Sequence, residues 1–413
     1  MDVVRVSKGD FMRKHGLAGP LGLAVALAVA AVTSCSTPGA GAEANIACDT
    51  PGVTADHVNL GFVFSNSGVG SAALSSARSG VDARLGLANA NGGIHGRTVV
   101  YDWRDDGSSP TANERMTTEL VQQQSVFGLL MVSSTIGGSP ERLAREGVPV
   151  VGLPQTDFAK YPNWFSHLYD VSPETIGRYL GIRGASKVAV VTTGSAQFVQ
   201  DLARRYAAAF GEVGLPTAEI IPFASGSDSP RQIARRITES GADSLVGFTT
   251  LDDFAQISQA VHDSQVELAA SVSLSGYDRS TLSRLGKQLV GVSFPVYFHP
   301  FEGGGPAIET YREAMGRFAP ETGQPDQQFA MYGYIYADMF LRGLELAGDC
   351  PTRESFISSL RNVPDFDAGG LIEPIDLRTN ATTPLQCSAF VEIDPTGMAF
   401  AVTREKLCAH DVA

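Results

Sequence analysis

Short apolar runs rich in β-branched residues alternate along this chain with longer stretches that have helical periodicity. The alternation forms two series, one from about Val58 to Leu153 and one from about Lys187 to Leu285. Strands that alternate with crossover helices of about 10–15 residues specify parallel, doubly wound sheets. The pattern therefore predicts an α/β fold with two lobes, each built on one such sheet.

The individual elements follow from the same pattern. The expected strands are Val58–Phe64, Thr98–Trp103, Val126–Val132, Val148–Leu153, Lys187–Thr192, Ala218–Phe223, Ser244–Phe248 and Glu267–Ser273. The expected helices are Ser71–Ala90, Thr111–Gln124, Pro140–Glu146, Gln197–Val213, Pro230–Ser240, Asp252–Ser264, Arg279–Leu285, Pro306–Phe318, Gln327–Ala347 and Thr352–Arg361. Two last runs, Ser388–Ile393 and Met398–Thr403, flank an Asp-Pro-Thr-Gly turn and predict a β-hairpin.

The N-terminus has the features of an export signal. A short basic segment, Met12–His15, precedes an apolar run from Leu17 to Val32 that is short for a stable membrane span. The run ends in Val-Thr-Ser followed by Cys35, which resembles the lipobox of bacterial lipoproteins, and this resemblance implies that Cys35 is lipidated. We expect residues 1–34 to be the signal peptide and 35–56 to be a tether, so that the protein is anchored to the outer face of the cell membrane. An ordinary signal peptide and an uncleaved anchor are the alternatives, and Met1 and Met12 are both possible starts.

Charge excludes one class of partner. The chain has a net charge of -13, and its first 34 residues hold four of the 31 basic and two of the 44 acidic residues, which leaves -15 on the remainder. So acidic a body repels phosphate backbones, and the sequence has no basic stripe to offset that repulsion. Nucleic acid is therefore not expected as a partner.

Motifs for catalysis, metals and cofactors are weak or missing. Residues 68–73 fit G-x-G-x-x-G/A, but Ser65-Asn66-Ser67 separate them from the strand, and the nearest strand-end acid, Asp102, comes 34 residues after Gly68. A glycine-rich loop lining a cleft explains the motif better than a dinucleotide site does. The sequence has no nucleophile elbow and no His or Cys cluster at metal-ligand spacing. We therefore expect no enzyme activity, no cofactor and no metal.

Three isolated features have structural explanations. His167 lies in an apolar stretch and is interpreted as a core imidazole with satisfied hydrogen bonds. The adjacent carboxylates Asp105-Asp106 and Asp252-Asp253 point to different sides of the chain, as in a solvated loop or a helix start.

Polar loops follow two neighbouring strands. Ser133-Ser134-Thr135 follows the apolar run 127–132 and precedes a helix start, and Pro154-Gln155-Thr156-Asp157 follows the next strand. Hydroxyls and free N–H groups at strand ends converge on whatever lies beyond the carboxyl edge of the sheet. These loops predict a ligand cleft, with helix capping alone as the other interpretation.

Six segments, taken in order, resemble bacterial solute-binding proteins of the leucine/isoleucine/valine type, the type I periplasmic binding proteins. They are Asn89–Arg97 (NANGGIHGR) with Asp102, Gly147–Val151 (GVPVV), Asp170–Pro173 (DVSP), Lys187–Val191 (KVAVV), Leu289–Val292 (LVGV) and Tyr332–Asp338 (YGYIYAD). The resemblance implies two Rossmann-like lobes, 57–171 plus 298–372 and 172–297 plus 373–413, joined by a three-segment hinge. It also implies a monomer that closes over a small molecule and delivers it to an ABC permease. A ligand-sensing receptor domain, or an enzyme on the same scaffold, is the alternative.

The resemblance also suggests site residues. In the family the loops after two first-lobe strands hold the ligand carboxylate, which matches Val132–Ser134 and Pro154–Thr156, and a second-lobe aromatic matches Phe198. The acid that pairs with an α-ammonium falls on Ser275, which cannot supply a counter-charge. We therefore expect a larger and less polar solute than a free amino acid, either an amino-acid-like molecule or an apolar or aromatic carboxylate or amide. The candidate ligand-binding residues are Ser65, Asn66, Ser133, Ser134, Gln155, Thr156, Phe198, Thr250, Ser275 and Tyr277.

Four cysteines remain when Cys35 is set aside, an even number in an exported protein. Strand starts and crossover-helix ends lie at the outer pole of a parallel lobe. Cys48 precedes the first strand and Cys350 follows the long late helix, whereas Cys387 and Cys408 flank the hairpin. Cys48–Cys350 and Cys387–Cys408 are preferred over the other two pairings.

Overall fold

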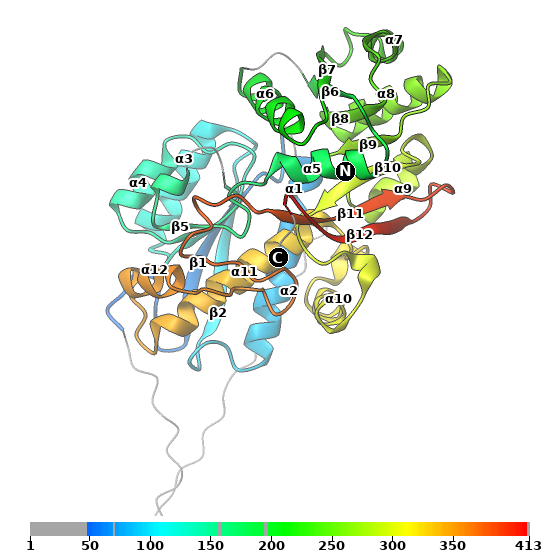
Figure 1. Ribbon diagram of the computed structural model, residues 1–413. Coiled ribbons are helices and arrows are strands. Elements are labelled where there is room, and N and C mark those ends of the chain that lie inside the picture. The colour runs from blue at the N-terminus through cyan, green and yellow to red at the C-terminus, as the bar shows by residue number, and fades with distance from the viewer. Residues whose placement is uncertain (1–47, 69–70, 155–157, 194–196, 411–413) are drawn as a thin grey trace, which may run out of the picture. The chain divides into compact units, whose positions relative to one another are not determined.

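The computed structural model describes residues 48–68, 71–154, 158–193 and 197–410 and contains two β-sheets (Figure 1). The first sheet has the order β2-β1-β3-β4-β5, and all of its strand pairs are parallel. Its strands are β1 (His57–Phe64), β2 (Thr98–Asp105), β3 (Leu129–Val132), β4 (Val150–Gly152) and β5 (Trp164–Phe165). The inner strands β3 and β4 are buried along their whole length, as parallel strands covered on both faces are.

The helices of the first sheet come from two distant parts of the chain. The early ones are α1 (Ser71–Leu74), α2 (Ala77–Ala90), α3 (Pro110–Thr118), a π-helical turn (Glu119–Gln123) and α4 (Ser139–Arg145). The late ones are α10 (Pro306–Phe318), α11 (Gln328–Ala347) and α12 (Arg353–Arg361). Helix α11 packs on α2, β3 and β4. Glycine permits the contact, because a Cβ on Gly80 would lie 1.8 Å from the Ala330 carbonyl oxygen and one on Gly333 would lie 2.1 Å from that of Ala77.

The second sheet has the order β12-β11-β10-β9-β8-β6-β7. Its strands are β6 (Val188–Thr193), β7 (Thr217–Phe223), β8 (Ser244–Phe248), β9 (Ala270–Ser273), β10 (Val292–Val296), β11 (Cys387–Ile393) and β12 (Phe400–Cys408). Its helices are α5 (Pro173–Ile182), α6 (Gln197–Glu212), α7 (Pro230–Ser240), α8 (Leu251–Asp263) and α9 (Arg279–Leu285). Strands β6 to β10 are parallel, and β11 is antiparallel to both β10 and β12. The expected all-parallel second sheet is therefore mixed, because the C-terminal hairpin pairs with its edge.

Both sheets share one strand order. In the first, β1 lies between β2 and β3, and β4 and β5 follow; in the second, β6 lies between β7 and β8, and β9 and β10 follow. This is the doubly wound order 2-1-3-4-5, in which ligands bind outside the carboxyl ends of the strands where the winding changes direction. In this fold the ends of β1 and β3 and the ends of β6 and β8 are therefore the positions where a ligand is expected.

Three crossings join the two sheets, as the fold class requires (Figure 1): residues 166–172, 297–305 and 362–386. The first and third lie side by side, since the Ser172 N–H donates to the Leu385 carbonyl at 2.9 Å and the Leu385 N–H donates to that of Asp170 at 2.9 Å. The second and third are joined by the His299 N–H and the Leu371 carbonyl, 2.8 Å apart. The lobe boundaries drawn from the sequence remain a prediction.

Some element boundaries differ from expectation. The single helix expected over Ser71–Ala90 is interrupted between α1 and α2, where the Ser76 hydroxyl donates to the Ala73 carbonyl. Such side-chain bonds offer the backbone an alternative to the helical pattern. The helix expected over Thr111–Gln124 ends in the π-helical turn, and the last strand runs on to Cys408. Strand β5 and helix α5 were not anticipated.

Both cysteine pairs favoured by the sequence lie at disulfide-bonding distance. Cys48 is paired with Cys350 across 302 residues of sequence, and Cys387 is paired with Cys408 across the hairpin. The first pair joins the segment before β1 to the segment after α11, so it closes the long loop between two parts of the chain that serve the first sheet.

Candidate functional site

Three serine hydroxyls gather where β1 and β3 end. The Ser65 Oγ lies 3.4 Å from the Ser133 Oγ and 3.3 Å from the Ser134 Oγ. Two hydrogen bonds from backbone N–H groups fix this arrangement. The Ser65 N–H donates to the Val132 carbonyl at 3.1 Å, and the Ser134 N–H donates to the Ser65 Oγ at 3.1 Å. Ser65 and Ser133 are buried, whereas Ser134 is exposed. Ser134 is the serine of the three that a solute can reach directly.

A buried carboxylate lies beneath these hydroxyls. Asp106, only 1 % exposed, accepts hydrogen bonds from the Ser65 hydroxyl at 2.8 Å, the Asn113 amide at 2.9 Å and the Ser108 N–H at 3.0 Å, and also from the Ser133 hydroxyl. A hydroxyl has a single proton, and that of Ser133 has both Asp106 and, at 2.7 Å, the Thr135 carbonyl as acceptors. The Ser65 and Ser133 oxygens in turn accept hydrogen bonds from the N–H groups of Ser134 and Thr135. Asp106 therefore orients the strand-end serines, and the interpretation of it as a solvated carboxylate was wrong.

The neighbouring carboxylate fixes the loop after β1. Asp105 accepts hydrogen bonds from the Ser67 hydroxyl at 2.7 Å and from the N–H groups of Asn66 (3.0 Å), Ser67 (3.2 Å) and Gly107 (2.9 Å). Burial alone would raise the pKa of Asp105, but these hydrogen bonds outweigh it and lower the pKa below its usual value. A Cβ on Gly68 would lie 2.3 Å from the Gly107 carbonyl oxygen, so the glycine allows the two loops to touch. The Asn66 side chain remains exposed beside them.

Threonines occupy the corresponding end of the second sheet. The N–H of Thr250, after β8, donates to the Oγ1 of Thr193, the last residue of β6, at 3.3 Å. The Thr250 Oγ1 accepts a hydrogen bond from the Asp253 N–H at 3.2 Å and so caps helix α8. The buried Thr249 Oγ1 has no hydrogen-bond partner among the described residues. Thr250 thus caps a helix in this structure, and the Thr249 hydroxyl, which has no partner among the described residues, lies beside it in the chain.

The loop after β9 contains Ser275 and Tyr277. Ser275 is half-buried, and its carbonyl accepts a hydrogen bond from the Ser273 hydroxyl at 2.8 Å. Tyr277 is 1 % exposed; its hydroxyl donates to Glu302 and accepts from the Phe301 N–H at 2.8 Å. Burial and the nearby Glu302 carboxylate raise the pKa of Tyr277. These two hydrogen bonds anchor the loop after β9, and contact of Tyr277 with a ligand stays a prediction.

Other expected site residues lie outside the described residues. These are Gln155 and Thr156 after β4, the side chain of Phe198 at the start of α6, and Cys35. Their assignments stay predictions.

His167 differs from expectation in one respect. It is buried, at 3 % exposed, but neither ring nitrogen has a hydrogen-bond partner among the described residues. Burial lowers the pKa of His167 to about 3, so the ring is neutral at physiological pH. The interpretation as a core residue is confirmed, and that of satisfied hydrogen bonds is wrong.

Within the described residues, no group of three or more His, Cys, Asp or Glu side chains is arranged to hold a metal ion. In the same part of the chain, every helix is too short or too polar to cross a membrane.

Comparison with known proteins places the chain among binding proteins. Residues 57–398 match the family model described as periplasmic binding protein. A search of curated proteins gave no match. Three solved structures show the same fold at low identity.

The substrate-binding protein LivJ of a branched-chain amino acid transporter from Streptococcus pneumoniae, solved with isoleucine, is 17% identical over 84% of this chain and 100% of its own, with a TM-score of 0.69. A fatty acid ABC transporter substrate-binding protein from Thermomonospora curvata is 18% identical over 88% of this chain and 95% of its own, with a TM-score of 0.72. A solute-binding protein of an ABC transporter from R. palustris, in complex with 4-hydroxybenzoate, is 17% identical over 84% of this chain and 96% of its own, with a TM-score of 0.70.

Proposed function

The chain belongs to the periplasmic binding protein family, and from this premise we propose that it captures a small solute at the strand ends of its two sheets and delivers it to an ABC importer. The observation that carries the proposal is the group of Ser65, Ser133 and Ser134 hydroxyls above Asp106. It lies at the ends of β1 and β3, where the doubly wound order favours ligand binding. Thr249 and Thr250 hold the equivalent place after β8 of the second sheet.

The polar groups near Asp106 restrict what the solute presents there. The carboxylates of Asp106 and Asp105 both lie at this end of the sheet, so a carboxylate of the solute would meet two negative charges there. A hydroxyl or amide that donates to a serine oxygen fits better. At the second sheet, Ser275 offers no counter-charge for an ammonium group.

We therefore propose a solute that is uncharged or mono-anionic, with an apolar or aromatic body, and whose uncharged polar end lies at Ser134. The 4-hydroxybenzoate in the complex of the R. palustris protein is a molecule of this kind. A free amino acid is disfavoured, because its ammonium group would lack a partner at Ser275.

Contacts from both sheets to one solute would stabilise the arrangement in which the sheets close over it, and that closed form would be what the permease recognises. The crossings are the segments that such a motion bends. The lipobox-like sequence ending at Cys35 supports export and anchoring at the outer face of the membrane.

A solute screen tests the proposal. Uncharged and mono-anionic aromatic solutes and the amino acids are screened by thermal shift, since a solute that binds the folded state raises its melting temperature. Calorimetry on the best solute then compares the wild type with Ser134→Ala, Thr156→Ala and Phe198→Ala. Ser283→Ala is the matched control, because its hydroxyl is exposed on α9 and donates within that helix to the Ser280 carbonyl.

Ser134→Ala is expected to weaken binding by about two- to tenfold, the effect of one neutral hydrogen bond. Phe198→Ala should lose affinity through lost stacking and burial. Thr156→Ala should cost about one to two orders of magnitude if its partner on the solute is charged. Unchanged affinity in all three variants would show that the solute binds elsewhere.

A further inference from the structure

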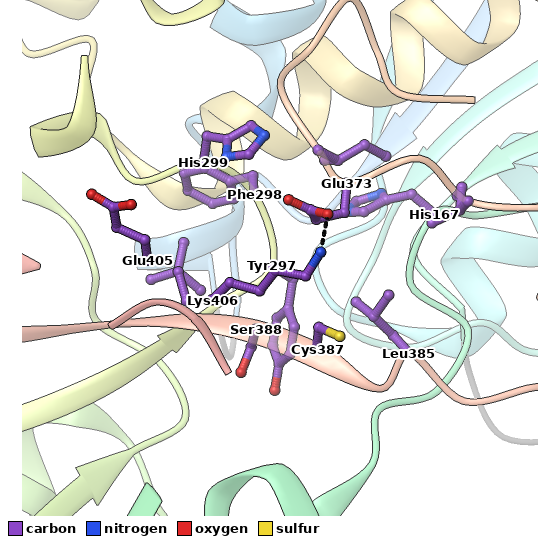
Figure 2. Close-up of a pocket in the computed structure, with 14 residues that line it drawn as sticks. His167, Tyr297, Phe298, His299, Glu373, Leu385, Cys387, Ser388, Glu405 and Lys406 are labelled. Atoms are coloured by element: carbon purple, nitrogen blue, oxygen red, sulfur yellow. Dashed lines mark hydrogen bonds and ion pairs between the residues drawn. The ribbon is translucent and has the colours of Figure 1, made fainter. Parts of the chain in front are cut away.

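Two pockets of very different size border the crossings. The first is lined by His167 and Ser388, with Lys406 paired to Glu373 beside them, and has a volume of about 30 Å³ (Figure 2). That is room for a water molecule or two. The second lies between α2, α10, α11 and a turn of the third crossing, and its volume of about 290 Å³ is close to the lower end of the range for ligand pockets. Of the two, this three-helix pocket has room for a small organic molecule.

An ion pair forms the polar side of the three-helix pocket. Arg84 of α2 and Asp338 of α11 have side chains only 21% and 17% exposed, and the Arg84 Nε donates to the Asp338 Oδ1 at 2.7 Å. The guanidinium also lies over the ring of Tyr334, 5.9 Å from its centroid. Both charged groups therefore have a fixed position at the pocket.

This ion pair leaves hydrogen-bonding capacity unused. Among the described residues, the bond from Nε to Oδ1 is the one hydrogen bond that either side chain makes, so the two NH₂ groups of Arg84 and the Oδ2 of Asp338 have no partner there. Burial raises the pKa of Asp338, against the charge and the hydrogen bond of Arg84, which lower it. Charged groups with so little exposure are usually hydrogen-bonded at more than one atom, so a bound molecule can satisfy the remaining donors and acceptor.

Two exposed polar side chains line the same pocket. Asn91, at the end of α2, comes seven residues after Arg84, which is about 10 Å along the helix axis. Its amide both donates and accepts, and it has no hydrogen-bond partner among the described residues. The Thr310 hydroxyl on α10 donates to the Pro306 carbonyl at 2.9 Å, so its oxygen can accept from a ligand.

The rest of the lining is mostly apolar and includes a strained turn. The apolar residues are Leu87, Pro306, Ala307, Ala368 and Leu371. Ala368, in the third crossing, has a φ of 52°, in the left-handed region that residues other than glycine seldom adopt, and Gly369 follows with a φ of 68°. The Asp367 carboxylate holds this turn by accepting from the Gly369 N–H at 2.9 Å. Backbone strain of this kind gathers at ligand sites.

The pocket's chemistry favours a neutral molecule with several hydroxyl groups. Arg84 and Asp338 neutralise each other, so an anion would meet a carboxylate and a cation would meet a guanidinium. A hydroxyl suits both, because one oxygen accepts from the guanidinium and donates to the carboxylate, and hydrogen bonds to charged groups are the strong ones. A six-membered ring with hydroxyls on opposite sides, and a hydrogen bond of about 2.8 Å at each, covers a span of the order that separates Arg84 from Asn91.

We propose that the three-helix pocket is a second binding site, which takes a small neutral ring molecule with several hydroxyl groups, such as a cyclitol or a monosaccharide. Neighbouring hydroxyls bind Arg84 and Asp338, a hydroxyl across the ring binds Asn91, and the C–H face of the ring packs on the apolar lining. The site goes beyond solute capture and does not depend on it, because its lining shares no residue with the strand-end groups.

Equilibrium dialysis of the purified protein with myo-inositol and with glucose tests the proposal. Dialysis is preferred to melting because sugars also stabilise proteins by exclusion from their surface. Cyclohexanol has the same ring with a single hydroxyl, and glucuronate is the matched anion of glucose; each should bind at least tenfold more weakly, the effect of a lost hydrogen bond to a charged group. Saturable binding of neither polyol, or equal binding of cyclohexanol or glucuronate, would overturn the proposal.

Variants locate the bound polyol. Asn91→Leu should weaken binding about two- to tenfold and Asp338→Asn about tenfold or more. Gln288→Leu is the matched control, because Gln288 is also an exposed amide without a side-chain hydrogen bond among the described residues and lies outside the pocket. Asn91→Leu removes no side-chain hydrogen bond within the described chain, so it decides even if Asp338→Asn does not fold. Binding that Asn91→Leu leaves unchanged would overturn the proposal.

Ser134→Ala separates this proposal from solute capture. Polyol binding that falls with Asn91→Leu and is unaffected by Ser134→Ala supports the three-helix pocket. Polyol binding that falls only with Ser134→Ala overturns it and assigns the polyol to the strand-end site. Failure of the strand-end proposal would leave the response of polyol binding to Asn91→Leu unchanged.

Discussion

Replacing Asp106 by asparagine should damage the strand-end site more than any other single isosteric change there. The carboxylate receives two hydrogen bonds at each oxygen: Ser65 and Ser108 at Oδ1, and Ser133 and Asn113 at Oδ2. An asparagine keeps one acceptor oxygen and turns the other position into an NH₂ donor. The serine hydroxyls can rotate away from that donor, whereas the Ser108 N–H and the Asn113 side-chain amide keep their direction.

The loss in free energy of unfolding follows from the hydrogen bonds that the asparagine cannot accept. In either orientation of the new amide, one N–H group, that of Ser108 or that of the Asn113 side chain, faces a donor in a buried place, at about 1–3 kcal/mol. The remaining bonds also lose the strength that a charged acceptor gives them. Together these effects come to about 3 kcal/mol. For the unit Asn45–Ala413, an unfolding entropy of about 0.8 kcal/mol/K converts this into a fall of about 4 °C in the melting temperature.

Calorimetric melting of Asp106→Asn beside Asp105→Asn measures the effect. Asp105 is the matched control, since it accepts a similar number of hydrogen bonds but lies half-buried at the end of β2, where water can replace lost partners more easily than at the buried Asp106. We expect a clearly smaller shift for Asp105→Asn, and weaker solute binding for Asp106→Asn because Ser65 and Ser133 lose their orientation. Equal shifts in the two variants, or a loss below about 1 kcal/mol for Asp106→Asn, would refute the assignment of Asp106 as the group that organises the site.

Three further predictions concern export, cysteine pairing and pH. The wild type should partition with membranes and Cys35→Ala should appear in the soluble or secreted fraction; identical partitioning would exclude the lipid anchor. Peptide mapping under non-reducing conditions should recover each cysteine pair seen in the structure as one linked peptide, and a link between the two pairs would contradict the fold. Burial raises the pKa of Asp278 from 3.8 to about 6, against a hydrogen bond from the Gln328 N–H that lowers it. The folded state therefore holds this proton more tightly than the unfolded state does, and stability declines as pH rises across that window. Asp278→Asn should flatten the decline in urea midpoint between pH 4 and pH 7, and an unchanged slope would argue against a perturbed Asp278.

The architecture was predictable because the spacing of apolar residues along the chain indicates which positions of each helix or strand are buried. Helices α7 and α10 have the bounds that the sequence predicted, since each begins at a proline and has an apolar stripe. Strand β5 was missed because Trp164–Phe165 is too short to show any alternation. The mixed character of the second sheet was missed because a hairpin pattern does not say which edge the hairpin joins.

The site was only partly predictable. Hydroxyls at the strand ends follow from their position after buried strands, and Ser65, Ser133 and Ser134 do come together. The burial of Asp106 depends on β2 lying next to β1, which is a property of strand order and not of local sequence. A sequence signal for this burial is an acidic residue directly after one strand, here Asp106 after β2, combined with a serine directly after the strand that pairs with it, here Ser65 after β1.

Side chains that pack between distant segments were the hardest to place. Tyr277 is close in sequence to Ser275, but its partner Glu302 belongs to the second crossing. The His167 ring packs against Tyr332 and Tyr336 on α11, and neither of its nitrogens has a hydrogen-bond partner among the described residues. Contacts of this kind are set by tertiary packing.

Calorimetric titration of the purified protein with the solute that gives the largest thermal shift, run beside a titration with leucine, tests the central claim most directly. The account predicts one-site binding of an uncharged or mono-anionic solute with an apolar or aromatic body, weakened by Ser134→Ala and unaffected by Ser283→Ala, with no detectable heat from leucine. Tight binding of leucine, or binding of the best solute that Ser134→Ala leaves unchanged, would contradict it.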